Sequence, residues 1–143
     1  MKKILLILLF LFVGCSRGTI DTGDQISRSE ILFQHNKERM INGNLKSLSR
    51  DLLLEDRAQK WAEVMAKRDS LTHSELEING TKFIIMGENI AMGYNDIDSV
   101  VDGWMNSQGH RKNILNPKYN KAGFGYAKMP NGSPYWCAQF AGD

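Results

Sequence analysis

The segment from about residue 51 to about residue 69 limits the fold most, because it is the clearest amphipathic helix in the sequence. Apolar side chains recur at helical spacing on one face, and charged side chains occupy the other. The apolar face consists of Leu54, Ala58, Trp61, Ala62, Met65 and Ala66. Since three of these side chains are alanines, a partner element can approach closely. The pattern therefore predicts a helix whose Trp and Met side chains are core residues.

A second helix is predicted over 26–41, before the amphipathic one. Its spaced side chains are Ile31, Leu32, His35 and Arg39. Ser27 or Ser29 is a suitable N-cap, and the polar triplet at 42–44 ends the helix. The nearby polar side chains of His35, Asn36 and Arg39 indicate a structural hydrogen-bond network more than a catalytic group.

A third helix is predicted to start at a cap on Asp98 and to stop near Ser107, because 100, 101, 104 and 105 are apolar. Gly109 is expected to take a positive φ there and to turn the backbone. His110 would then lie on a second short helical or looped segment beside the packed Trp104. A structural role for His110 in a loop hydrogen bond is the alternative.

Strand patterns gather late in the chain. We expect strands over 81–85, 121–128 and 134–140, and Asn131-Gly132 is a strong signal for a hairpin between the last two. Because the helical patterns come first, an α+β fold is favoured over an alternating α/β fold. Cys137 falls on the last strand, where we interpret it as a buried and inert thiol.

Residues 1–14 have the pattern of a signal peptide. Lys2 and Lys3 precede an apolar run over 4–13 that is too short to span a bilayer comfortably. The residues at 11–15, Leu-Phe-Val-Gly-Cys, resemble a bacterial lipobox, which implies cleavage before Cys15 and acylation of its thiol. We therefore expect a lipidated tether over 15–25 and one domain over 26–143. A plain secreted protein is the alternative.

Charge and cysteine content narrow the functional classes further. The chain has 18 basic and 16 acidic residues, and two of the basic residues belong to the leader, so the mature chain has a formal net charge of zero. This balance gives no electrostatic footprint for nucleic acid. If Cys15 is acylated, Cys137 is the only remaining thiol and no intramolecular disulfide can form. Packing must then supply the stability of the domain.

Several spaced motifs together resemble the CAP superfamily of cysteine-rich secretory, antigen 5 and pathogenesis-related proteins, also called SCP-like domains. In chain order they are His35-Asn36 with Arg39, His73-Ser74, Gly87-Glu88-Asn89-Ile90-Ala91, and Trp104 with Ser107, His110-Arg111 and Asn113-Ile114-Leu115. The resemblance covers about 26–140 and is closest to the bacterial branch. It implies an α-β-α sandwich in which helices flank a central antiparallel sheet.

The resemblance also implies a cleft lined by two histidines and two acidic residues. Matched by position, these are His73, His110 and Glu88, while Ser107 stands where animal and plant members have the second acid. His73, Glu88 and His110 could hold Zn²⁺ or another divalent metal. Asn89, Trp104 and Asn113 join the structural network. His73, Glu88, His110 and Ser107 are the catalytic candidates, although Ser107 cannot replace a carboxylate base.

The missing second carboxylate favours a non-enzymatic binding module whose His/Glu cleft holds a divalent metal or a small ligand. Three alternatives stay open: a zinc-dependent hydrolase acting on envelope peptides or peptidoglycan, a lipid- or sterol-binding protein, and a structural hydrogen-bond network of His73, Glu88 and His110 without a ligand. We expect the protein to be exported and held at the outer membrane or the cell surface by the lipid on Cys15. An extracellular protein or lipid is the expected partner, and nucleic acid is not.

Overall fold

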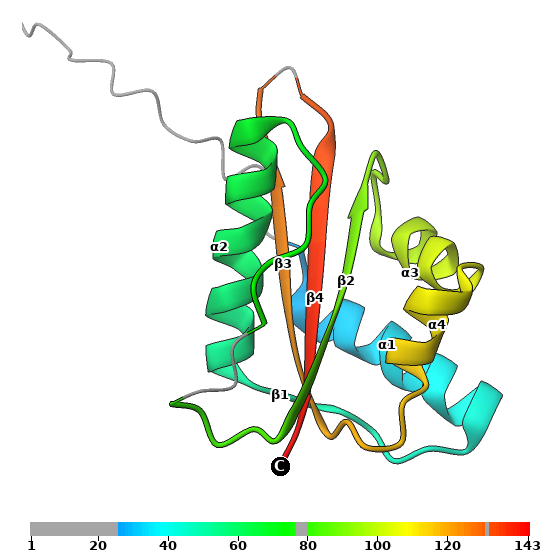
Figure 1. The fold of residues 1–143 in the computed structure, drawn as a ribbon. Coiled ribbons are helices and arrows are strands. Elements are labelled where there is room, and N and C mark those ends of the chain that lie inside the picture. Colours follow the sequence, from blue (N-terminus) through cyan, green and yellow to red (C-terminus); the bar gives the residue numbers. More distant parts are fainter. Residues whose placement is uncertain (1–25, 77–79, 131) are drawn as a thin grey trace, which may run out of the picture.

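A computed structural model of the protein describes residues 26–76, 80–130 and 132–143. Its core is a four-stranded sheet in the order β1-β3-β4-β2. The three long strands, β2 (Ile85–Met92), β3 (Lys121–Lys128) and β4 (Pro134–Gly142), pair antiparallel, with β4 between the other two. The short β1 (Ser49–Arg50) pairs parallel with β3 at one edge. β2 forms the opposite edge (Figure 1).

One face of the sheet is covered by α2 (Leu52–Arg68) alone (Figure 1). Asp51 caps this helix by accepting hydrogen bonds from the backbone N–H groups of Leu53 and Leu54. Two glycines of β3 permit the close approach, because a Cβ at Gly125 would lie 2.2 Å from the Ala58 carbonyl oxygen and one at Gly123 would meet the backbone of the same helix. The small side chains on α2 and the two glycines on β3 therefore let the helix pack close to the sheet.

The other face carries α1 (Arg28–Gly43), α3 (Ile97–Met105) and α4 (Gln108–Ile114) (Figure 1). Successive side chains of β4 point to opposite faces of the sheet, so this strand contributes to a hydrophobic core on each face. The larger core lies under these three helices and includes Trp136 and Phe140, whereas Tyr135 and Cys137 face α2. The sequence-based prediction of an α-β-α sandwich of the α+β class is confirmed.

The strand predictions differ from the structure in two places. The predicted strand over 81–85 is wrong, since β2 begins only at Ile85 and runs through Glu88 to Met92. The β2 residues 88–91 are buried on both faces, so they lack the alternation of buried and exposed side chains by which a strand is recognised. The two-residue β1 adds a parallel pairing to a sheet that we expected to be antiparallel throughout.

Two details of the helix prediction are also wrong. Asp96, not Asp98, caps α3 by accepting a hydrogen bond from the Ser99 N–H. Gly109 does not take a positive φ, because the chain already turns at Asn106 and Ser107 and Gly109 lies within α4. Residue 131 of the predicted hairpin lies outside the described residues, as do the predicted signal peptide, Cys15 and the predicted tether.

Candidate functional site

Glu88 is a buried carboxylate near the middle of the edge strand β2. Its side chain is 1% exposed and points to the α2 face of the sheet, where its register partner on β4 is Gln139. Oε1 accepts hydrogen bonds from the Ser74 N–H at 2.9 Å and from His73 Nδ1 at 2.8 Å. Oε2 accepts from Ser74 Oγ, from Gln139 Nε2 at 3.0 Å and from Cys137 Sγ at 3.6 Å. Both oxygens are therefore fully engaged.

These contacts decide the ionisation state of Glu88. Burial by itself raises the pKa of the carboxyl group, but the hydrogen bonds from Ser74, Gln139 and His73 outweigh it, so the pKa lies below its ordinary value. The carboxylate is charged at neutral pH. Burial, together with this nearby negative charge, raises the pKa of the Cys137 thiol well above its usual range. The thiol stays protonated, which makes it a poor nucleophile.

His73 lies on the loop after α2, and 62% of its side chain is exposed. The bond to Glu88 fixes the ring, because a carboxylate that is already charged can only accept the Nδ1 proton. In the neutral imidazole, Nε2 then carries a lone pair and has no hydrogen-bond partner among residues 26–76, 80–130 and 132–143. Glu88 thus acts as an orienting group for an outward-facing histidine.

His110 lies on α4, beyond the edge of β2 and on the opposite side from α2. Burial lowers the pKa of its imidazole, and the charge of His73 lowers it further. A network fixes the backbone here, because Asn89 donates to the His110 carbonyl oxygen at 3.0 Å and Asn113 donates to the Glu88 carbonyl oxygen at 3.1 Å. We call His73, Glu88 and His110 the histidine site.

Ser107 is the N-cap residue of α4, but its side chain makes no capping hydrogen bond. The described part of the chain contains no hydrogen bond between Ser107 and His110. The geometry therefore supplies neither a second carboxylate nor an activated serine hydroxyl beside the imidazole.

The other polar residues singled out in the sequence tie the helices to the sheet. Buried Arg39 donates to the carbonyl oxygens of Lys46, Ile114, Asn116 and Tyr119. Asn36 exchanges two hydrogen bonds with the backbone of Leu48, and Trp104 Nε1 donates to the Ile90 carbonyl oxygen. His35 is enclosed by aromatic rings and donates from Nδ1 to the Ile31 carbonyl oxygen at 2.8 Å.

Sequence reasoning did not assign Ser74, Cys137 and Gln139 to the site. Ser74 was visible only as part of a motif with His73. Cys137 and Gln139 converge on Glu88 because β4 pairs with β2 in one particular register, and no local pattern encodes that register.

Comparison with known proteins places this geometry in a family. The model of the cysteine-rich secretory protein family, CAP, matches residues 32–140, which include the whole histidine site. The chain belongs to the CAP family. An uncharacterized CAP relative, YkwD of Bacillus subtilis (strain 168), is 37% identical over 116 residues, which are 75% of this chain and 44% of the relative. The chain thus spans less than half the length of that protein.

Solved structures agree with this assignment. An extracellular protein of Bacillus anthracis that contains an SCP domain is 26% identical, with a TM-score of 0.67 over 81% of this chain and 40% of that one. An outer surface protein of Borrelia burgdorferi is 24% identical, with a TM-score of 0.65 over 80% and 87% of the two chains. The fold is also shared by NaASP2, whose crystal structure is described as being with Zn²⁺ (20% identity, TM-score 0.58, 84% and 82% covered).

The sequence predicted that His73, Glu88 and His110 could together hold a divalent metal, and the structure does not contain such a three-ligand set among its described residues. Residues 26–76, 80–130 and 132–143 hold no group of three or more His, Cys, Asp or Glu side chains placed to bind one ion. The oxygens of Glu88 already accept hydrogen bonds from buried and backbone donors. The imidazoles are the groups of the histidine site that keep donor atoms.

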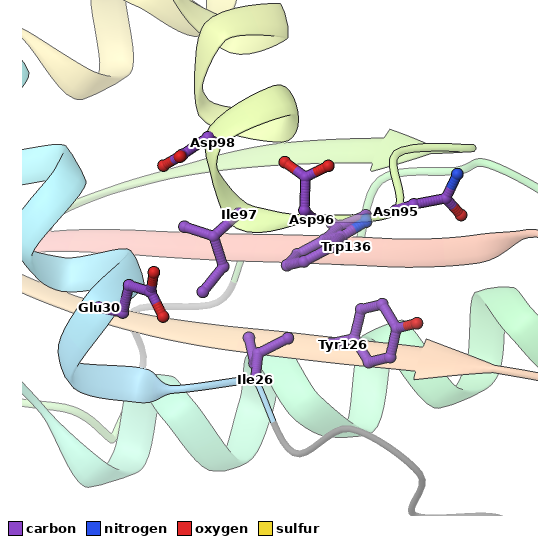
Figure 2. A pocket seen from close by; sticks show the side chains of 8 residues that line it. All are labelled: Ile26, Glu30, Asn95, Asp96, Ile97, Asp98, Tyr126 and Trp136. Atoms are coloured by element: carbon purple, nitrogen blue, oxygen red, sulfur yellow. The ribbon is translucent and has the colours of Figure 1, made fainter.

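A cavity of about 280 Å³ that contains no residue of the histidine site lies on the α1 face of the CAP sheet, between the N-terminal ends of α1 and α3 (Figure 2). Trp136 and Tyr126 lie across its floor, and three carboxylates line it. Its lining residues are Ile26, Glu30, Asn95, Asp96, Ile97, Asp98, Tyr126 and Trp136. The volume is below the usual range for drug-sized ligands, and the acidic side chains oppose a fatty-acid headgroup. The cavity therefore offers no support for the lipid-binding alternative.

Proposed function

We propose that this chain is a lipid-anchored extracytoplasmic binding protein, in which the two imidazoles of the histidine site hold a divalent metal or a small ligand. The observation that carries the proposal is the saturation of Glu88. A carboxylate that already accepts five hydrogen bonds can neither take a proton from water nor give an oxygen to a metal without breaking contacts that hold the loop at 73–74. Binding needs only the exposed His73 and the half-buried His110.

The location outside the cytoplasm is supported by the leader pattern at 1–15 and by the locations of two proteins of similar structure. The compared Bacillus anthracis protein is extracellular and the Borrelia burgdorferi protein is an outer surface protein. In the part of the chain that the structure describes, no helix is long and apolar enough to cross a membrane. An acylated Cys15 would supply the attachment.

The histidine site fits a metal in a limited way. The Glu88–His73 hydrogen bond has the arrangement in which a carboxylate fixes an imidazole tautomer and leaves Nε2 free for an ion. His110 is held neutral by its lowered pKa, which is the form that binds metals. A bound divalent cation would supply an attachment point for an anionic or neutral donor of the ligand. Because two protein donors are fewer than the three or four of dedicated zinc sites, we expect moderate affinity.

Calorimetric titration with Zn²⁺ tests this proposal. The mature chain carrying Cys15→Ser cannot be acylated and is suited to solution work. We expect binding that is lost in His73→Ala and in His110→Ala and is unchanged in Cys137→Ser. Glu88→Gln should weaken binding by about 10- to 100-fold without abolishing it, as expected for a group that orients a ligand.

Two results would contradict the binding proposal. Zinc affinity that survives in both histidine variants would place the metal elsewhere. Turnover of a peptide, ester or peptidoglycan fragment by the purified protein, abolished by Glu88→Ala and by chelation, would show that the zinc-dependent hydrolase is the correct function.

The anchor has a separate test. Mass spectrometry of the mature protein should find a diacylglyceryl group on an N-terminal Cys15, and the Cys15→Ser variant should be recovered without lipid. An unmodified N-terminus at another residue would overturn the anchor and leave the binding proposal standing.

A further inference from the structure

The first helix has a buried side and, on the opposite side, a row of exposed residues that are mostly apolar. Ile31, His35 and Arg39 repeat at i, i+4 and i+8 and are buried against the sheet and its neighbours. Phe33, Lys37, Met40 and Ile41 repeat at i, i+4, i+7 and i+8 and lie on the side turned away from that core. We call these four residues the α1 stripe.

Among the residues that the structure describes, the apolar members of the α1 stripe are largely uncovered. Phe33 is 64% exposed, Met40 63% and Ile41 64%. Single exposed apolar residues are ordinary, but three large ones within three turns of one helix form a contiguous surface. The lysine among them can extend its amine to a polar layer while its stem lies on apolar material. This combination is typical of a helix at a lipid–water interface.

The position of α1 in the chain points to the same occupant. It is the first element of the described fold, and Arg28 follows Cys15 by thirteen positions. Thirteen residues span at most about 45 Å even when fully extended. An acyl chain on Cys15 therefore keeps α1 within that distance of the bilayer surface, closer along the chain than any other element.

We propose that the α1 stripe docks on the surface of the membrane that holds the lipid anchor, with Phe33, Met40 and Ile41 in the interfacial region and Lys37 at the anionic headgroups. This inference rests on the proposed acylation of Cys15. Docking also orients the domain. Because α1 and α2 cover opposite faces of the sheet (Figure 1), the α2 face and His73 then point away from the bilayer, toward soluble ligands.

Spin labelling of the acylated mature protein tests the docking. The protein is reconstituted in vesicles of phosphatidylcholine and phosphatidylglycerol, with a nitroxide at Phe33→Cys or Met40→Cys and a control nitroxide at Lys67→Cys on the exposed side of α2. Cys137 is buried, and the parent protein without new cysteines measures any labelling there. We expect labels at 33 and 40 to be relaxed more by oxygen than by a water-soluble nickel complex, and the label at 67 to show the reverse.

Different results separate the two proposals. Protein that fails to float with the vesicles refutes the anchor. Protein that floats while the labels at 33 and 40 remain as accessible to nickel as the label at 67 refutes the docking alone. Spin–spin broadening at 33 and 40 that disappears on dilution in lipid would identify a second copy of the chain as the occupant and would also overturn the proposal.

A substitution keeps the test independent of the labels at 33 and 40. The triple change Phe33→Ser, Met40→Ser and Ile41→Ser removes side chains that the fold does not use, so thermal unfolding should be unchanged. The triple variant should still float on its lipid, but a nitroxide at Lys37→Cys should lose its membrane signature and become as accessible to nickel as the control at 67. A membrane signature retained in the triple variant would refute the role of the stripe.

Discussion

Replacing Glu88 with glutamine should destabilise the domain although the side chain keeps its shape. The amide has one acceptor oxygen instead of two. Its NH₂ group would face the groups that donate hydrogen bonds to the carboxylate in the wild type. Exposed His73 can change tautomer at little cost, but Gln139 Nε2 is buried and would face another donor. An unsatisfied buried donor costs about 1–3 kcal/mol and a lost bond to a charge about 1.5–3 kcal/mol. We therefore expect a loss of about 2–5 kcal/mol at pH 7.

Urea denaturation of the mature Cys15→Ser chain, followed by tryptophan fluorescence at a series of pH values, measures this loss. The pKa of Glu88 in the folded protein lies below its ordinary value of 4.5. The unfolded state therefore takes up a proton before the folded state does, and the stabilisation is present above pH 4.5 and is lost as the pH falls through the lower, folded pKa. The free energy difference between wild type and Glu88→Gln should shrink over that acidic window.

Glu63→Gln is the matched control, because Glu63 lies on the exposed side of α2 and its change should stay within about 0.5 kcal/mol. Equal urea midpoints for wild type and Glu88→Gln at pH 7 would refute the reasoning. A difference that stays constant down to pH 3 would also refute it, because the stabilisation would then not depend on the charge.

Three further predictions concern the scaffold. Gly125→Ala should lower the free energy of unfolding by about 3 kcal/mol, because the new methyl group overlaps the Ala58 carbonyl oxygen of α2. This value is in the upper part of the range for overpacked cores. Gly109→Ala is the control in the same urea experiment and should be neutral or stabilising, because Gly109 lies in a helix and has open space around its Cα. Arg39→Lys should cost about 2–4 kcal/mol, because one ammonium group cannot reach four carbonyl oxygens and leaves buried acceptors unpaired; an unchanged midpoint would contradict this role. Burial lowers the pKa of His35 from 6.5 to about 4. Because the unfolded state then binds more protons between these pH values, the free energy of unfolding should fall by about 1.4 kcal/mol for each unit by which the pH decreases in that range. His35→Leu should flatten this pH dependence, and an equally steep dependence in the variant would place its origin elsewhere.

Much of the fold follows from local patterns. The amphipathic face of α2 was readable because small and apolar side chains repeat at helical spacing, and β3 and β4 were readable from their late, turn-bounded positions. The strand β2 was not, because residues 88–91 are buried on both faces and Glu88 puts a charge within that buried run. Its pairing with β4 and the loop at 73–74 together supply the donors that make the charge on Glu88 stable.

The sequence by itself determined the fold class, the family resemblance and the identity of the histidines, because these depend on residue type and spacing. Tertiary structure decided what each group can do. Glu88, expected as a metal ligand, is an orienting group because register brings Gln139 and Cys137 to it and a loop brings Ser74. Likewise, α1 carries apolar residues on both sides, but only packing against the sheet buries Ile31 with His35 and Arg39 and leaves Phe33, Met40 and Ile41 exposed. The reason is that burial is a property of the assembled layers.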